Sequence, residues 1–354
     1  MWLAEEYASL GIRVSLASLH PGNSRFQTGG GHHHRVVVLG RASQSSRGVH
    51  RSPFQRIAQR ITISVRLAGL VLSRFPDTVI CFSPSVDKTL ILAGTFLPIR
   101  VLLVQAIPNG GVYRLHRIYR TLISKQHARV VVSTQHMAIE LRRLYRVPTL
   151  VIPNPVMIPP IQRVDRTNRP AIRVISFGRF THQKGWDILI DAVDTLIRCA
   201  DVPDFTVLVY GGEPRDSAYW AQLTEKVRSS GLEHCISFAP ATTDVPRILA
   251  RADLFVFPSR YEGFGNALVE AMSCGVGCVA SDCTYGPSEI LDHGRYGILV
   301  KPNDAAALAK GLKFAISSPD RLSGLATAAQ RGANRYEPRP IMKHWIKAIG
   351  FDVD

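Results

Sequence analysis

Two basic residues, Arg179 and Lys184, stand in the segment Gly178-Arg179-Phe180-Thr181-His182-Gln183-Lys184-Gly185. Arg179 follows an apolar run, and Lys184 stands at the expected start of a helix, where the helix dipole disfavours a cation. An anion in the same site would explain such a cation, because arginine chelates phosphate in a forked geometry and lysine adds a point charge. Two solvated surface cations are the alternative interpretation of these residues taken alone.

A second loop places glycines between two carboxylates, in the order Glu262-Gly263-Phe264-Gly265-Asn266-Ala267-Leu268-Val269-Glu270. Glycine lets backbone N–H groups come close to a ligand, and the N-terminus of the expected helix is an anion site. Carboxylates placed like those of Glu262 and Glu270 can accept hydrogen bonds from sugar or ribose hydroxyls. The same pair could instead do the acid–base work of a glycosidase, or be a helix-terminal charge and a surface residue.

Both loops lie in a pattern in which apolar strands alternate with helices, which predicts a parallel sheet covered on both faces. Expected strands are 173–177, 205–210, 235–238, 254–257, 277–280 and 297–300, and expected helices are 184–199, 217–230, 244–251, 265–274, 287–292 and 304–316. Ligands of such sheets bind beyond the carboxyl ends of the strands. The candidate loops are therefore 178–184, 211–215, 239–244, 258–265 and 281–287.

The first part of the chain shows the same alternation. Expected strands are 14–19, 35–39, 78–82, 100–104, 128–133 and 149–152, and expected helices are 54–74, 85–97, 113–126 and 137–145. A length of 354 residues suits two domains. We expect an α/β chain with a first doubly wound domain over 1–155, a Pro-rich linker over 156–170, a second over 171–335, and a C-terminal helix over 336–354 that crosses back to the first domain.

Four motifs in order carry a family resemblance: Ser176-Phe177-Gly178-Arg179 with Lys184-Gly185, Glu262 to Met272, Gly286-Pro287-Ser288-Glu289-Ile290, and Gly294 to Val300. They resemble family 4 glycosyltransferases. The resemblance implies the GT-B fold, two Rossmann-like domains facing across a cleft, and sugar transfer from a nucleotide sugar with retention and without a metal. Cys283 ahead of Gly286-Pro287 is similar to enzymes that extend glycans on polyprenyl-diphosphate carriers.

The resemblance also implies roles for single residues. Arg179 and Lys184 would grip the donor diphosphate, Glu262 would hold hydroxyls of the transferred sugar, and Glu270 would hold the ribose. We therefore name Glu262, Arg179 and Lys184 as catalytic. The expected donor-binding set is Gly178, Arg179, Lys184, Gly212, Glu262, Gly263, Phe264, Gly265, Asn266, Ala267 and Glu270.

The first domain departs from the family pattern. Many members carry a histidine after the fourth strand, but residues 101–108 contain none, and His116, His127 and His136 are not at the matching place. His32-His33-His34 is interpreted as a polar hairpin or loop tip more readily than as a metal site. Asp352-Val353-Asp354 resembles a metal-binding DxD motif, but it stands at the chain terminus and is discounted. We expect no cofactor other than the nucleotide sugar itself, which is a co-substrate and is most simply UDP-linked.

Charge is unevenly distributed along the chain. Residues 1–160 hold 20 Lys and Arg against 5 Asp and Glu, whereas residues 161–354 hold 23 against 22. An anionic membrane surface suits the basic part, and a solvated basic face is the alternative. A nucleic-acid partner is not expected, because no aromatic–basic interleaving accompanies the charge.

The apolar segments and the cysteines of the sequence predict where in the cell the protein lies. The longest apolar stretch, 89–107, is interrupted by Pro98 and Arg100 and is no membrane span. No signal peptide is visible, and six cysteines without a CxxC pair suit a reducing cytosol. Cys274 and Cys278 are expected in the core. The prediction is a cytoplasmic protein, peripheral on the inner face of the membrane.

The start of the sequence suggests a missing first strand. Residues 3–11 resemble the helix that usually follows that strand, and 13–19 resemble the second strand. In the usual doubly wound order the first strand lies in the middle of the sheet, so its absence would leave neighbours about 9–10 Å apart. We expect either a mis-assigned start codon or an inactive remnant.

Three functions compete with a transferase that uses a UDP-type donor and a lipid-linked or other glycan acceptor. A GT-B nucleotide-sugar epimerase would need several acid–base residues from the first domain, which the sequence does not show. A degenerate paralogue would bind the nucleotide sugar without turnover. A nucleic-acid binder is the weakest of the three.

Overall fold

The computed structural model describes residues 2–10, 12–18, 35–40, 69, 76–82, 100–105, 128–157, 171–212 and 218–350. The histidines at 32–34, the terminal DxD, most of the expected linker, and the expected helices over 54–74, 85–97 and 113–126 (residue 69 apart) lie outside the described residues. The chain divides into two compact units. Unit 1 is Met1–Ile152 with Ile341–Asp354, and unit 2 is Pro153–Pro340.

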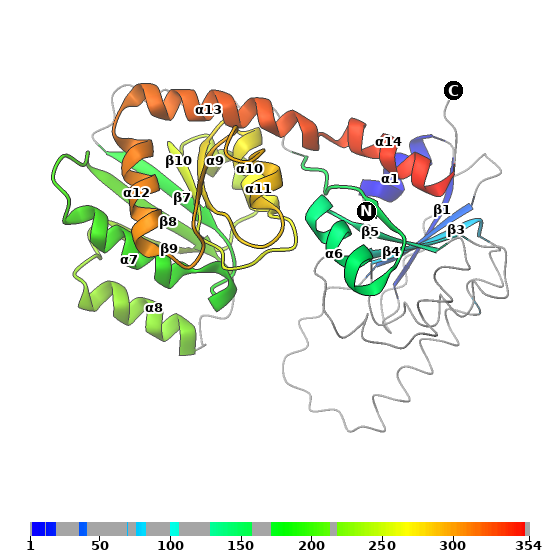
Figure 1. The fold of residues 1–354 in the computed structure, drawn as a ribbon, viewed down its shortest axis with the longest axis horizontal. Helices are drawn as coiled ribbons and strands as arrows, with labels where there is room; N and C mark the ends of the chain where they lie inside the picture. The colour runs from blue at the N-terminus through cyan, green and yellow to red at the C-terminus, as the bar shows by residue number, and fades with distance from the viewer. Residues whose placement is uncertain are drawn as a thin grey trace. The chain divides into compact units, whose positions relative to one another are not determined.

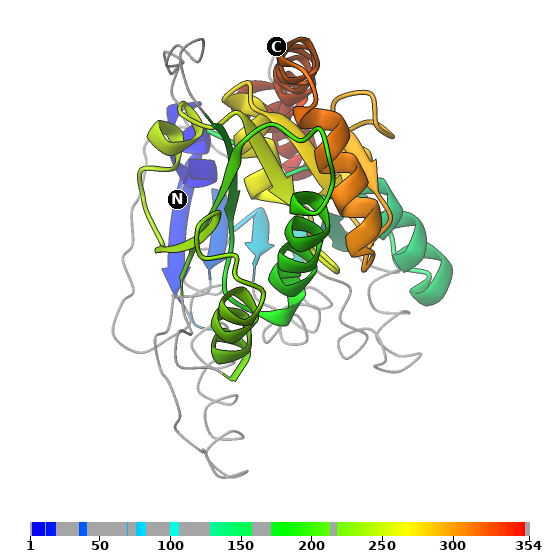
Figure 2. The same ribbon diagram turned by 90° about the vertical axis from the view of Figure 1, so that its left-hand side faces the viewer.

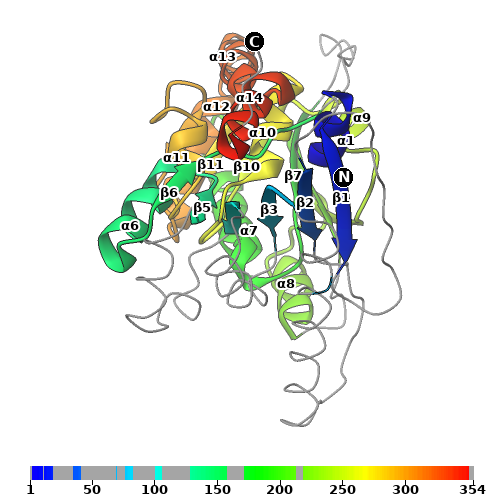
Figure 3. The ribbon, with the colours of Figure 1, turned by 90° about the vertical axis from the view of Figure 1, so that its right-hand side faces the viewer.

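Unit 1 is built on six parallel strands that follow one another in chain order across the sheet (Figures 1 and 3). The apolar runs that predict these strands supply a buried interior. The strands are β1 (Arg13–Ser18), β2 (Arg35–Gly40), β3 (Thr78–Cys81), β4 (Arg100–Gln105), β5 (Ala128–Val132) and β6 (Thr149–Val151).

The expected gap of one strand, with its neighbours about two strand spacings apart, is not found among the described strands of unit 1, and that prediction is wrong. β2 pairs with β1 through Val36 and Val14 on one edge, and with β3 through Val36 and Thr78 on the other. Because β2 pairs in parallel with a strand on each side, its backbone N–H and C=O groups hydrogen-bond to both β1 and β3. Among these described strands, the order also lacks the reversal that a doubly wound domain would have.

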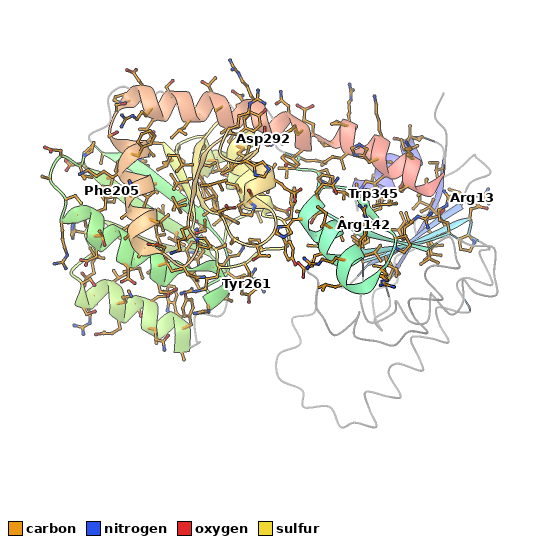
Figure 4. All side chains as sticks on the ribbon, in the orientation of Figure 1. Arg13, Arg142, Phe205, Tyr261, Asp292 and Trp345 are labelled. Atoms are coloured by element: carbon orange, nitrogen blue, oxygen red, sulfur yellow. The ribbon has the colours of Figure 1, made fainter. Side chains whose placement is uncertain are left out.

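Three helices cover the described part of unit 1: α1 (Trp2–Ser9), α6 (Gln135–Tyr145) and α14 (Pro338–Ile349). The hydroxyl of Tyr7 on α1 is buried and donates to the backbone oxygen of Trp345 on α14 (3.1 Å). Trp345, labelled in Figure 4, also contacts the ring of Phe82, with centroids 6.3 Å apart. The C-terminal helix therefore completes the core of the N-terminal unit.

Unit 2 also has six parallel strands, in the order β12-β11-β10-β7-β8-β9. They are β7 (Ile172–Phe177), β8 (Phe205–Gly211), β9 (Ile236–Pro240), β10 (Leu254–Phe257), β11 (Gly277–Ser281) and β12 (Ile298–Val300). The chain builds outward from β7 in one direction and from β10 in the other. The order therefore reverses between β7 and β10, which is where doubly wound sheets place their ligands.

Helices of unit 2 pack against this sheet, and α7 lies beside α12 (Figure 2). Residues of α7, α8 and α12 share one apolar core with the sheet. Cys274 and Cys278 are buried, as the sequence predicts. The helices are α7 (Trp186–Ile197), α8 (Ala218–Ser229), α9 (Val245–Leu249), α10 (Asn266–Ser273), α11 (Pro287–Ile290), α12 (Ala305–Ile316) and α13 (Pro319–Ala333), with short 3-10 turns η1 (His182–Lys184) and η2 (Asn334–Tyr336).

Two helices differ from the sequence prediction. Helix α7 begins at Trp186 rather than at 184, because Gly185 has a left-handed backbone (φ 69°) and ends η1 before α7 starts. Lys184 therefore ends a separate tight turn. Helix α13 was not predicted, although Ser318 caps it by accepting from the N–H of Arg321 (3.3 Å). Across the described residues, no helix is long and apolar enough to span a membrane.

Candidate functional site

The loops that follow β7 and β10 meet at the point where the strand order reverses. Lys184 and Glu262 form an ion pair there, with Nζ 2.5 Å from Oε1. The hydroxyl of Ser259 donates to the same carboxylate oxygen (2.7 Å), and Glu262 is only 7% exposed. Lys184 also lies over the ring of Phe257, with Nζ 5.4 Å from the centroid. The site thus has a charged centre that is largely withdrawn from solvent.

Backbone shape brings the two loops close enough for this pair. Gly185 packs on the carbonyl oxygen of Pro258, where a side chain would collide, and its positive φ also favours glycine. The indole N–H of Trp186 donates to the carbonyl oxygen of Arg179 (2.9 Å), which fixes the first half of the loop. These contacts explain why a glycine follows Lys184.

Gln183 and Arg260 add further links between the same loops. The N–H of Arg260 donates to the carbonyl oxygen of Gln183 (2.8 Å), and the side chain of Gln183 donates to the carbonyl oxygen of Tyr261 (3.0 Å). Tyr261 is 48% exposed and is labelled in Figure 4. The guanidinium of Arg179 is exposed and donates to the side-chain oxygen of Gln183 (3.3 Å).

Arg260 also forms a forked ion pair with Asp187 in the first turn of α7. The two N–O distances are 2.8 and 2.6 Å, and the hydroxyl of Tyr219 donates to the same carboxylate (2.7 Å). Burial acts to raise the pKa of Asp187, but hydrogen bonds from Arg260 and Tyr219 outweigh it and lower the pKa to about 2. Asp187 is therefore ionised at neutral pH.

The loop after β11 closes against the loop after β10. Tyr261 and Thr284 form a parallel bridge, and the N–H of Glu262 donates to the carbonyl oxygen of Thr284 (3.3 Å). Cys283 is buried in this contact, and burial together with the nearby Glu262 raises the pKa of its thiol to about 12. The thiol is thus a packing group at neutral pH and not a nucleophile.

Helix α10 points its N-terminus into the same cluster of loops. Its N-cap is Gly265 (φ 117°), and no side chain there accepts a hydrogen bond from the first turn. The first N–H groups of a helix have no partner within it, and so they suit an anion. The side chain of Asn154 donates to the side-chain oxygen of Asn266 (2.9 Å), which fixes the orientation of that first helical residue.

Glu270 stands four residues after Asn266 on α10 and is partly buried. Removal of its carboxyl from water raises its pKa.

Gly212 lies in the loop after β8, and its carbonyl oxygen accepts from the N–H of Phe180 (3.4 Å). A methyl group on Gly212 would come within 3.2 Å of the Ala241 side chain. A methyl group on Gly178 would likewise come within 3.0 Å of the indole ring of Trp186.

The structure therefore brings Lys184 and Glu262 into contact, and it links Arg179 through the side chain of Gln183 to the loop that carries Glu262. Sequence reasoning did not assign roles to Ser259, Arg260, Gln183 or Asp187. Ser259 and Arg260 belong to a loop that the sequence marks as ligand-binding, so their position was a usable signal. Nothing in the sequence links Asp187 to Arg260, which stands 73 residues later.

Comparison with protein families gives a match to unit 2. Residues 171–318 match the model of a family described as glycosyl transferases group 1. Among curated proteins, the chain is 34% identical over 173 residues to the lipopolysaccharide core biosynthesis mannosyltransferase LpsB of Rhizobium meliloti. It is also 26% identical over 230 residues to the amylovoran biosynthesis glycosyltransferase AmsD of Erwinia amylovora.

These matches cover part of each protein. The LpsB match includes 47% of this chain and 48% of LpsB, and the AmsD match includes 61% and 60%. The chain therefore spans about half the length of the curated relatives it matches.

Among solved structures, Anabaena HepE in complex with UDP and glucose has a TM-score of 0.69 at 20% identity, covering 89% of this chain and 91% of HepE. The fold shared with such neighbours is GT-B.

Proposed function

From the premise that residues 171–318 form a group 1 glycosyltransferase domain in a chain with the GT-B fold, we propose that this protein transfers a sugar from a nucleotide sugar to a glycan or lipid-linked acceptor. The observation that supports it most is the Lys184–Glu262 pair at the strand reversal of unit 2. A cation for phosphate and a carboxylate for hydroxyls stand side by side there, as a sugar joined to a diphosphate requires.

The donor is proposed to be a UDP-sugar. HepE was solved with UDP and glucose, and relatives such as LpsB and AmsD are named for building lipopolysaccharide and amylovoran. By analogy, the product belongs to a polysaccharide or glycoconjugate. Glu270, whose carboxyl is partly buried on α10, is proposed to accept hydrogen bonds from the ribose.

The chemistry is departure of a diphosphate from the sugar carbon. Negative charge grows on the leaving oxygen, and preformed cations and N–H dipoles stabilise it. Lys184, Arg179 and the N-terminus of α10 supply those groups, while Glu262 holds the sugar hydroxyls. Ser259 donates to Glu262 (2.7 Å), so the carboxylate keeps its orientation when Lys184 turns toward phosphate. Retention of configuration and independence of a metal are carried over from the resemblance as part of the proposal.

Nucleotide sugars are expected to stabilise the protein against heat, because a ligand of the folded state raises its stability by mass action. A thermal-shift panel of nucleotides should show UDP and UDP-sugars raising the melting temperature by about 5–10 °C at roughly 100 times Kd.

Arg179→Ala and Lys184→Ala should each weaken binding of the nucleotide sugar roughly 10- to 150-fold, since a charge-assisted phosphate contact contributes about 1.5–3 kcal/mol. Calorimetry measures these affinities.

The matched control is Lys226→Ala on α8, which removes an exposed ion pair with Asp191 on the same unit. It should leave nucleotide affinity unchanged, because an exposed pair contributes about 0–1 kcal/mol to stability and nothing to phosphate binding. Unchanged affinity in both the Arg179 and Lys184 variants would rule out the proposed donor site.

The acceptor is proposed to be carried on a membrane, which the protein approaches through basic unit 1. Within the described residues, Lys343 and Lys347 are exposed one turn apart on α14, and two arginines are exposed at the end of α6, Arg143 in its last turn and Arg146 at its C-cap. Each basic residue near an anionic surface contributes about 1 kcal/mol. Cosedimentation with vesicles containing anionic lipid should therefore be strong at low salt and fall as salt rises.

The double variant Lys343→Glu/Lys347→Glu should reduce this cosedimentation. Lys310→Glu/Arg331→Glu is the matched control, since it changes charge equally at exposed positions of unit 2. Binding that is independent of salt, or absent at low salt, would contradict membrane docking. Equal losses in the two double variants would show that net charge and not unit 1 is responsible.

A further inference from the structure

Arg260 is a partly buried cation near the proposed donor site, and the proposed chemistry does not use it. Its side chain is 16% exposed, and its guanidinium stands among the loops that hold Lys184 and Glu262. A cation in such a place has two possible tasks. It either binds phosphate directly or holds other groups in position.

The hydrogen-bond partners of Arg260 decide between the two tasks. Nη1 donates to the carbonyl oxygen of His182 (2.8 Å) and to Asp187 (2.8 Å), and Nη2 donates to the second oxygen of Asp187 (2.6 Å). A forked pair with a carboxylate already neutralises the guanidinium. Releasing it to a phosphate would leave Asp187, which is ionised, without its cationic partner and with the neutral hydroxyl of Tyr219 as its remaining side-chain donor.

The contacts of Arg260 end on the turn that carries Lys184 and on the first turn of the helix that follows it. His182 begins η1, Gln183 accepts the Arg260 N–H, and Asp187 lies in the first turn of α7 just beyond Gly185. Arg260 itself stands two residues before Glu262. One side chain therefore fastens the segment bearing the cation to the segment bearing the carboxylate.

We propose that Arg260 is a positioning residue, which together with Asp187 sets the geometry of the Lys184–Glu262 pair. The proposal rests on the proposed function for its kinetic part, but its structural part stands without it. A misplacement of about 1 Å at a reacting centre can reduce turnover roughly 10²-fold. The loss is expected mainly in kcat, because the phosphate-binding cations themselves remain.

Asp187→Ala separates positioning from direct phosphate binding. If Arg260 acts through its pair, Asp187→Ala and Arg260→Ala should lower kcat alike, and the double variant should lose no more than either single one. If Arg260 bound phosphate itself, Asp187→Ala would free the guanidinium and leave kcat unchanged, whereas Arg260→Ala would weaken donor affinity, and that pair of results would overturn the proposal. Arg260→Lys should not restore turnover, because an ammonium cannot form the fork.

A second measurement needs no sugar transfer. Lys184 is 15% exposed and paired with Glu262, so it should react slowly with acetic anhydride, as followed by peptide mass spectrometry. Arg260→Ala and Asp187→Asn should raise its acetylation rate several-fold. Arg228→Ala, which breaks an exposed Arg–Glu pair on α8, is the control and should change neither this rate nor turnover.

The two measurements distinguish failure of the inference from failure of the proposed function. A wild type that binds no nucleotide sugar contradicts the function, whereas the acetylation rates still test Arg260. Unchanged Lys184 reactivity in folded Arg260→Ala, verified by its melting curve, would overturn the positioning role. Asp187→Asn, which keeps the size of the side chain, supplies the same readout where Arg260→Ala does not fold.

Discussion

Glu262→Gln is expected to reduce kcat roughly 10²-fold or more, with a much smaller effect on UDP affinity. The carboxylate faces the sugar in the proposed complex, so its hydrogen bonds act on the reacting part and not on the nucleotide. In this structure Glu262 also accepts from Lys184 (2.5 Å) and Ser259 (2.7 Å). The amide keeps the size of the side chain but cannot neutralise the cation, so the substitution removes charge with little change in packing.

Glu270→Ala is the matched comparison and should show the opposite pattern. Its carboxylate is proposed to hold the ribose, so UDP affinity should fall more than turnover at saturating donor. Steady-state kinetics and UDP calorimetry on both variants test the assignment. The reverse order of effects would contradict the roles proposed for both residues.

In the wild type, proton NMR of the product should show that the transferred sugar keeps the anomeric configuration that it had in the donor.

Gly286→Ala is expected to be the most destabilising single substitution considered for this molecule. Gly286 has a φ of 96° and packs on the carbonyl oxygen of Phe264, where a methyl group would collide with backbone. Strain at such a φ costs about 1–3 kcal/mol, and overpacking adds about 1–3 kcal/mol. A loss of about 2–6 kcal/mol in the free energy of unfolding follows, and it should be measured by chemical denaturation.

Two other glycines calibrate that experiment. Gly231 also has a positive φ (65°) but has open space around its Cβ position, so Gly231→Ala should cost only about 1–2 kcal/mol. Gly324 lies within α13 with nothing near its Cβ position, so Gly324→Ala should stabilise by about 0.5–1 kcal/mol. A Gly286→Ala variant no less stable than Gly231→Ala would show that the collision with Phe264 does not occur.

The order of elements in unit 2 was predictable from the sequence. Apolar runs of four to six residues, separated by amphipathic segments, place strands and helices at nearly their observed positions, and β10 is found at the predicted residues. The candidate loops follow directly, because they are the segments after each strand. Local periodicity was less informative at element ends, and Gly185 moved the start of α7 by two residues.

Which loops meet was not predictable in the same way. The Lys184–Glu262 contact joins residues 78 apart, and it depends on β7 and β10 being neighbours in the sheet. Periodicity along the chain shows that a strand is buried, but it does not name the strand that it pairs with. The same reason explains the error in unit 1, where β2 pairs with β3 and the expected gap between strands is not found among the described residues.

The sequence by itself determined an α/β chain and the resemblance to group 1 glycosyltransferases, and it predicted Arg179, Lys184 and Glu262 as site residues. These depend on residue types at short spacings, which a linear pattern records. Only the tertiary structure decided that Lys184 is held by Glu262, and that Arg260 is bound to Asp187. Forked ion pairs require side chains from separate loops to converge, and close glycine contacts require the backbones of separate loops to converge. The sheet order that brings these loops together is set by packing of the whole unit.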